Sequence, residues 1–96
     1  MPGGRHAFLE MKLFLLNLPL KFTEAHLRML LEEHCTIMYL ELMTGHETGL
    51  SKGIAFLQVA NDREGRFLIA ALNGFLIRGR PMYVSEDKGL NPESQD

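Results

Sequence analysis

Four short apolar segments are separated by two segments of helical periodicity, and this order constrains the fold of the 96-residue chain more than any other feature. The strand-like segments are residues 11–18, 36–43, 53–59 and 82–85. The helical segments follow Thr23 and Asn61, two residue types that favour the N-cap position. The order predicts an α+β fold, a βαββαβ sandwich with a four-stranded antiparallel sheet backed by two helices. Because two helices cover only one face of such a sheet, we expect the other face to be open to solvent or a ligand.

Local signals also predict where the helices and the last strand begin and end. The sequence from Asn61 to Glu64 fits a capping box, with Asn61 in the place of the usual Ser or Thr. Asn73 and Gly74 predict the end of the second helix, because both residue types tolerate a left-handed backbone. Residues 78–81 predict a turn before the last strand. The apolar residues expected to face the sheet are Leu27, Leu30 and Leu31 in the first helix, and Leu68, Ile69 and Leu72 in the second.

Length and composition indicate one small domain with polar ends. We expect a flexible leader at residues 1–10, the folded domain at 11–85 and an acidic flexible tail at 86–96. The domain has eight basic and seven acidic residues, whereas the tail has four acidic residues and one basic residue. The net charge of -2 therefore comes from the tail, and the nearly neutral domain argues against nucleic-acid binding by bulk electrostatics.

Several functional classes are excluded by what the sequence lacks. One cysteine allows neither an internal disulfide nor a multi-cysteine zinc site, and the four histidines lie in different segments, so we expect no metal and no cofactor. Residues 13–20, the longest apolar stretch, are too few to span a bilayer, so we expect no membrane partner. Cys35 is predicted to be a partly buried thiol without an orienting partner, and we expect no catalytic activity. We expect an intracellular protein, nuclear or cytoplasmic, with an organelle not excluded.

Two of the strand segments carry motifs of a known family. Residues 52–59, KGIAFLQV, resemble the octapeptide of the RNA recognition motif, K/R-G-F/Y-G/A-F-V-x-F/Y. Residues 13–18, LFLLNL, are similar to the hexapeptide on the first strand of that family. The resemblance covers residues 11–85. It implies the ferredoxin-like form of the βαββαβ fold and single-stranded RNA as the ligand.

Residues two apart on a strand share one face, and this alternation predicts the side chains that line the open face. Phe14 and Phe56 are expected to lie side by side there, and the resemblance implies that bases stack on them. The alternative is core packing in a register shifted by one residue, which would bury Lys12 and Lys52. The predicted RNA-binding residues are Lys12, Phe14, Lys52, Ile54, Phe56, Gln58 and Tyr83. The lysines and Tyr83 also fit ordinary solvated surface positions.

Three departures from the family pattern favour a second hypothesis. Ile54 stands where the family usually has a third aromatic residue, and Glu41 is expected on the open face, where it would repel phosphates. Leu16 and Met43 make that face more aliphatic. We therefore expect the domain alone to bind RNA weakly. We expect its role to be in RNA processing or mRNA metabolism. The alternative is an adaptor whose sheet face binds a protein partner.

The outer side of the helices offers another surface for such a partner. The helical period turns Met29 outward from the first helix and Phe67 outward from the second. Exposed apolar side chains of this size suggest a protein-binding surface, although two scattered surface residues are the plainer interpretation. Gly65 stands where the family prefers Ala, which suggests that this helix approaches the sheet closely.

Overall fold

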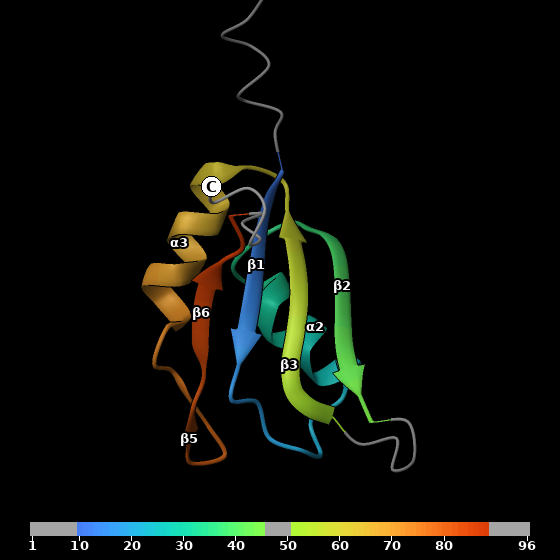
Figure 1. The fold of residues 1–96 in the computed structure, drawn as a ribbon. Helices are drawn as coiled ribbons and strands as arrows, with labels where there is room; N and C mark the ends of the chain where they lie inside the picture. Colours follow the sequence, from blue (N-terminus) through green and yellow to red (C-terminus); the bar gives the residue numbers. More distant parts are fainter. Residues whose placement is uncertain (1–9, 46–50, 89–96) are drawn as a thin grey trace, which may run out of the picture.

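The structure is a computed structural model that describes residues 10–45 and 51–88 (Figure 1). Its elements are β1 (Met11–Leu16), α2 (Glu24–Glu32), β2 (Ile37–Thr44), β3 (Ser51–Val59), α3 (Asp62–Leu72), β4 (Leu76–Ile77), β5 (Arg80–Pro81) and β6 (Tyr83–Glu86). Most of the predicted leader and tail, and the side chain of Lys52, lie outside the described residues.

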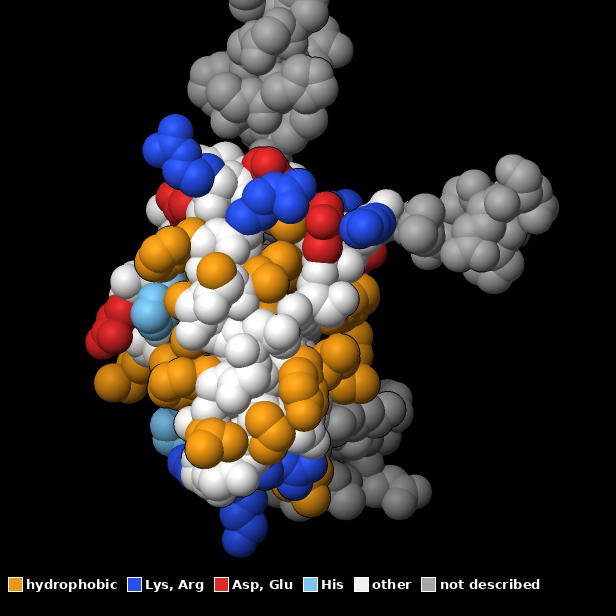
Figure 2. All heavy atoms as spheres, turned by 90° about the vertical axis from the view of Figure 1, so that its left-hand side faces the viewer, with side chains coloured by type: hydrophobic (Ala, Val, Ile, Leu, Met, Phe, Trp, Pro, Cys, Tyr) orange, Lys and Arg blue, Asp and Glu red, His pale blue; other side chains and the backbone are white. Residues whose placement is uncertain are grey.

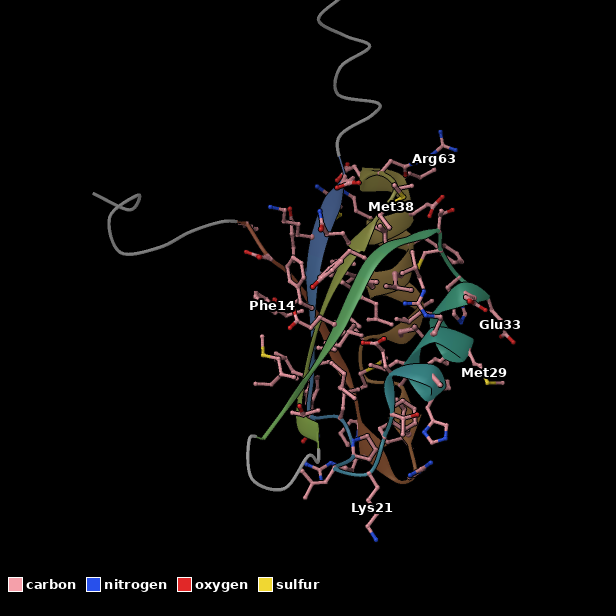
Figure 3. All side chains as sticks on the ribbon, turned by 90° about the vertical axis from the view of Figure 1, so that its right-hand side faces the viewer. Phe14, Lys21, Met29, Glu33, Met38 and Arg63 are labelled. Carbon is pink, nitrogen blue, oxygen red and sulfur yellow. The ribbon has the colours of Figure 1, made fainter. Side chains whose placement is uncertain are left out.

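The main sheet confirms the predicted fold class. Its four strands are antiparallel neighbours in the order β2-β3-β1-β6, which places the two motif strands, β1 and β3, at the centre. Both helices pack on one face of this sheet, and the described residues leave the opposite face open (Figures 1 and 3). The fold therefore presents the central strands on a surface that neither α2 nor α3 covers.

Alternation along β1 and β3 builds the core between the sheet and the helices. Leu13, Leu15 and Leu57 are fully buried, while the residues between them turn to the open face. A shift of one residue in the pairing would bring these leucines to the open face and send Lys12 inward, so burial stabilises the observed register. The core residues from the helices are Leu27, Leu31, Leu68 and Leu72, with Leu30 and Ile69 partly buried against them.

A small hairpin occupies the segment for which the sequence predicts only a turn. β4 and β5 pair antiparallel, with Leu76 opposite Pro81 and Ile77 opposite Arg80. The two residues between the strands, Arg78 and Gly79, have φ angles of 52° and 84°. Positive φ at both positions gives a two-residue turn whose twist suits a hairpin. The last strand of the main sheet therefore begins at Tyr83, one residue later than expected.

The helix ends follow the predicted signals with two corrections. Thr23 caps α2 in a full capping box, because its Oγ1 accepts from His26 N and its own N–H donates to His26 Nδ1. Asn61 caps α3 through Oδ1, which accepts from Glu64 N at 2.9 Å. The predicted capping box at Asn61 is wrong in its second half, because the Glu64 carboxylate accepts instead from the backbone N–H and the hydroxyl of Thr36.

At the end of α3, the two predicted stop residues have different backbone conformations. Gly74 has a φ of 88°, the left-handed conformation expected of it. Asn73 is instead extended, and its Oδ1 accepts a hydrogen bond from Val84 N at 3.0 Å. The asparagine side chain therefore ties the end of α3 to β6.

Candidate RNA-binding face

Phe14 and Phe56 are direct partners across β1 and β3 on the open face. Their ring centroids are 5.7 Å apart and their planes are inclined by 62°, an edge-to-face arrangement. Both rings are half-buried, and Figure 3 shows Phe14 pointing away from the helices. The rings therefore lie outside the core. Their role in RNA binding stays a prediction.

A third ring, Tyr39, joins this pair and was missed from the sequence. Its centroid lies 6.0 Å from that of Phe56, and its side chain is exposed. The pairing of β2 with β3 shifts between Ile37 and Tyr39, so that Ile37 faces Val59 and Tyr39 faces Gln58. The irregularity leaves Met38 as an extra residue in the β2 register, as in a β-bulge. The sequence did contain a signal for this third ring. Tyr39 lies two residues before Glu41 on the same strand, and residues two apart share one face.

Glu41 lies on the open face, as the alternation predicts. It is the Cα partner of Phe56, and its Oε1 accepts a hydrogen bond from the Tyr39 hydroxyl at 3.1 Å. This hydrogen bond, together with the negative charge of Glu41, raises the pKa of the Tyr39 hydroxyl. Through the same hydrogen bond the Tyr39 hydroxyl holds the carboxylate beside the rings.

Two of the predicted polar contacts, Lys12 and Gln58, lie at the end of the sheet where β1 begins. Lys12 is exposed and is the Cα partner of Gln58. Gln58 is half-buried, and its Nε2 donates to Glu10 Oε1 at 2.7 Å. The amide that was expected to contact RNA is thus hydrogen-bonded to an acidic residue of this chain.

Toward the other end of the sheet, the open face becomes aliphatic. Leu16 is the Cα partner of both Ile54 on β3 and Tyr83 on β6. Ile54 is half-buried, whereas Tyr83 is exposed with its ring on the open face. These residues extend the aromatic cluster of Phe14, Phe56 and Tyr39 with apolar surface.

The outer side of the helices exposes the two apolar residues that the period predicts. Met29 is 70% exposed and Phe67 is 57% exposed. Figure 3 shows Met29 on the helix side of the molecule, opposite Phe14. The Phe67 ring lies 6.3 Å from the ring of His34, so it has one aromatic neighbour at the surface. The exposure is as predicted. A protein partner for these residues stays a prediction.

Cys35 is a partly buried thiol, as expected from its place before β2. Its Sγ lies 3.5 Å from the Leu31 carbonyl oxygen, and burial, with a smaller effect of the Glu64 charge, raises the thiol pKa to about 11. A thiol with this pKa is protonated at neutral pH and is a poor nucleophile. Within residues 10–45 and 51–88, no three His, Cys, Asp or Glu residues are grouped as metal ligands. None of the helices in these two stretches is long and apolar enough to cross a membrane.

Comparison with known proteins identifies the family to which the chain belongs. Residues 13–83 match the family model of the RNA recognition motif. The chain belongs to this family. As an RNA recognition motif it is 32% identical over 74 residues to the RNA-binding protein CP31B, chloroplastic, of Arabidopsis thaliana, a match that covers 77% of the chain. It is 33% identical over 85 residues to a U2af large-subunit splicing factor of Triticum aestivum, a match that covers 88% of the chain.

A solved structure, a complex of the Sxl-lethal protein with RNA, has the same fold. Its TM-score to this RNA recognition motif is 0.75 at 26% sequence identity, over 79% of this chain and 47% of that chain. The matches span 26% of the length of the Arabidopsis protein and 14% of the wheat protein. The relatives are therefore much longer than the region they share with this chain.

Proposed function

We propose that this RNA recognition motif binds single-stranded RNA by stacking bases on Phe14 and Phe56. The observation that carries the proposal is the pair of half-buried rings, with centroids 5.7 Å apart, on the sheet face opposite α2 and α3. Rings in this setting offer flat apolar surface, and each stacked base contributes about 1–3 kcal/mol. Tyr39, 6.0 Å from Phe56, extends the stacking surface onto β2.

The remaining predicted residues have supporting roles in this proposal. Lys12 is exposed next to the rings, where its ammonium group can pair with a phosphate, and Lys52 is assigned the same role from its place in the octapeptide. Gln58 and Tyr83 supply hydrogen-bonding groups, and Ile54 supplies apolar contact. Since this face has few cations, we expect modest affinity for the domain alone. The name of the wheat relative, a splicing factor, supports a role in RNA processing or mRNA metabolism.

Fluorescence anisotropy with a labelled single-stranded oligonucleotide tests the proposal. The double variant Phe14→Ala with Phe56→Ala loses both rings. We expect it to bind RNA at least tenfold more weakly, since each stacked base contributes roughly 1–3 kcal/mol. Phe67→Ala removes an exposed ring from the opposite side of the molecule and serves as the matched control. Circular dichroism would verify that each variant is folded. Equal binding by the double variant and the wild type would refute stacking.

The second candidate function is the binding of a protein partner through the outer side of the helices. The observation that favours it is the exposure of Met29 on α2 and Phe67 on α3. An adaptor of this kind would keep its partner when Phe14 and Phe56 are lost. The double variant and Phe67→Ala therefore separate the two surfaces.

A further inference from the structure

Glu41 occupies a position on the open face where a negative charge opposes the binding of phosphates. It is the Cα partner of Phe56 and is exposed. No Lys, Arg or His of the described residues lies within 4.0 Å of its carboxylate. An acidic group beside the central ring repels phosphates. If Glu41 contributes to RNA binding, it therefore does so through contacts with the bases.

The carboxylate is held in place beside the ring. The Tyr39 hydroxyl donates to Oε1 at 3.1 Å, and the Tyr39 ring itself packs 6.0 Å from Phe56. Directly opposed residues on neighbouring strands have Cβ atoms about 5 Å apart, so the carboxylate reaches the edge of a base that lies on Phe56. Each carboxylate oxygen accepts more than one hydrogen bond, which leaves Oε2 and part of Oε1 free for a ligand.

The chemistry of a carboxylate selects among the bases. It only accepts hydrogen bonds, and two parallel N–H donors are its best partner. Guanine presents such a pair, N1–H and N2–H, side by side on its Watson–Crick edge. Adenine and cytosine have a ring acceptor beside their amino group, and the single imino donor of uracil lies between two carbonyl oxygens. An ionised carboxylate repels those acceptors.

We infer that Glu41 gives this RNA recognition motif a preference for guanine at the base stacked on Phe56, with Tyr39 as the residue that positions the carboxylate. The inference rests on the proposed function, because it requires a base on Phe56. In this inference, Glu41 contacts the edge of the base, and Lys12 and Lys52 contact the phosphates.

The test compares hexauridine with versions that carry a single guanine, adenine or inosine at the third position, by fluorescence anisotropy. We expect the guanine oligonucleotide to bind about tenfold more tightly than the adenine one, as for a bidentate base contact. Inosine keeps N1–H and lacks the N2 amino group, so its affinity is expected between the two. Glu41→Gln should bring the ratio of guanine to adenine affinity close to one.

Two further variants separate base recognition from charge and from folding. Glu33→Gln removes an exposed acidic group on the helix side, shown in Figure 3, and should leave the ratio unchanged. Tyr39→Phe keeps the ring and removes the hydroxyl, so it should lower the guanine preference while the affinity for hexauridine stays the same. A guanine preference that survives in Glu41→Gln would overturn the inference.

The outcome for the wild type distinguishes the inference from the proposed function. Binding of all four oligonucleotides with equal affinity would refute guanine selection and leave RNA binding intact. Absence of binding to all four would refute the proposed function, and the inference with it.

Discussion

At the end of the sheet where β1 begins, one hydrogen bond places an acidic residue among the predicted RNA contacts. Gln58 Nε2 donates to Glu10 Oε1 at 2.7 Å, and Lys12 is the Cα partner of Gln58. The Glu10 carboxylate therefore takes one of the two N–H donors of the Gln58 amide and lowers the positive potential around Lys12. RNA must compete with this carboxylate for that donor.

Glu10→Ala is accordingly expected to tighten RNA binding. The exposed charge contributes on the order of 0.2–1 kcal/mol, which corresponds to a gain in affinity of about 1.4-fold to fivefold. Anisotropy at low salt measures the change, with Glu32→Ala on α2 as a control that removes an equal charge from the helix side. Unchanged or weaker binding by Glu10→Ala would show that the carboxylate does not compete with RNA.

At the scale of the elements, α3 packs against the start of β1 through Gly65. The residue is buried, and a Cβ built on it would overlap Sδ of Met11 and lie 3.0 Å from its Cγ. Met11 is itself buried at the start of β1. The absence of a side chain at Gly65 therefore lets the methionine fill the space between helix and strand.

A double-mutant cycle tests this contact. Gly65→Ala gains about 1 kcal/mol of helix propensity but crowds Met11, and overpacking costs about 1–3 kcal/mol, so we expect a net loss near 1 kcal/mol. In a Met11→Ala background the obstacle is gone, and Gly65→Ala should stabilise the protein by about 0.5–1 kcal/mol. Urea denaturation measures both differences. The same sign in the two backgrounds would contradict the proposed crowding.

For the molecule as a whole, the position of the cations matters more than the net charge. Figure 2 views the side of α3 and β6 and shows Lys and Arg at both ends, with apolar side chains between them. At the lower end the guanidinium of Arg78 lies 5.3 Å from the centroid of the Phe22 ring, and Arg80 donates to Asn17 Oδ1 at 2.7 Å. These arginines contribute to the fold itself. On the open face, Lys12 is exposed beside the rings, two residues from Phe14 on β1.

RNA affinity should therefore depend weakly on salt. Two to three phosphate contacts at about -0.7 each predict a slope of roughly -1.5 to -2 for log affinity against log salt. Anisotropy titrations across a range of salt concentrations measure the slope, and Arg63→Gln, on the helix side of the molecule in Figure 3, should leave it unchanged. A slope steeper than about -4 would mean that cations dominate binding, contrary to stacking.

The features that followed from sequence are those that depend on local periodicity. The strand and helix order, the inward leucines and the placement of Phe14 and Phe56 on one face follow from repeats of two or about 3.6 residues. Alternation assumes an unbroken strand, so it gives no sign of the extra residue at Met38. Tyr39 could have been found, because it lies two residues before Glu41, which was already expected on the open face. The β4–β5 hairpin was missed because its strands have two residues each, too few for a pattern.

By itself, the sequence determined the order of the elements and the residues that share each face, because both depend on neighbours a few positions away. The tertiary structure alone decided which polar groups from distant parts of the chain meet. Glu64 reaches Thr36, 28 positions away, and Gln58 reaches Glu10, 48 positions away. Such pairs form where packing brings separate elements together, and no local pattern encodes them. The same is true of Glu41 beside Phe56, whose proximity depends on how β2 pairs with β3.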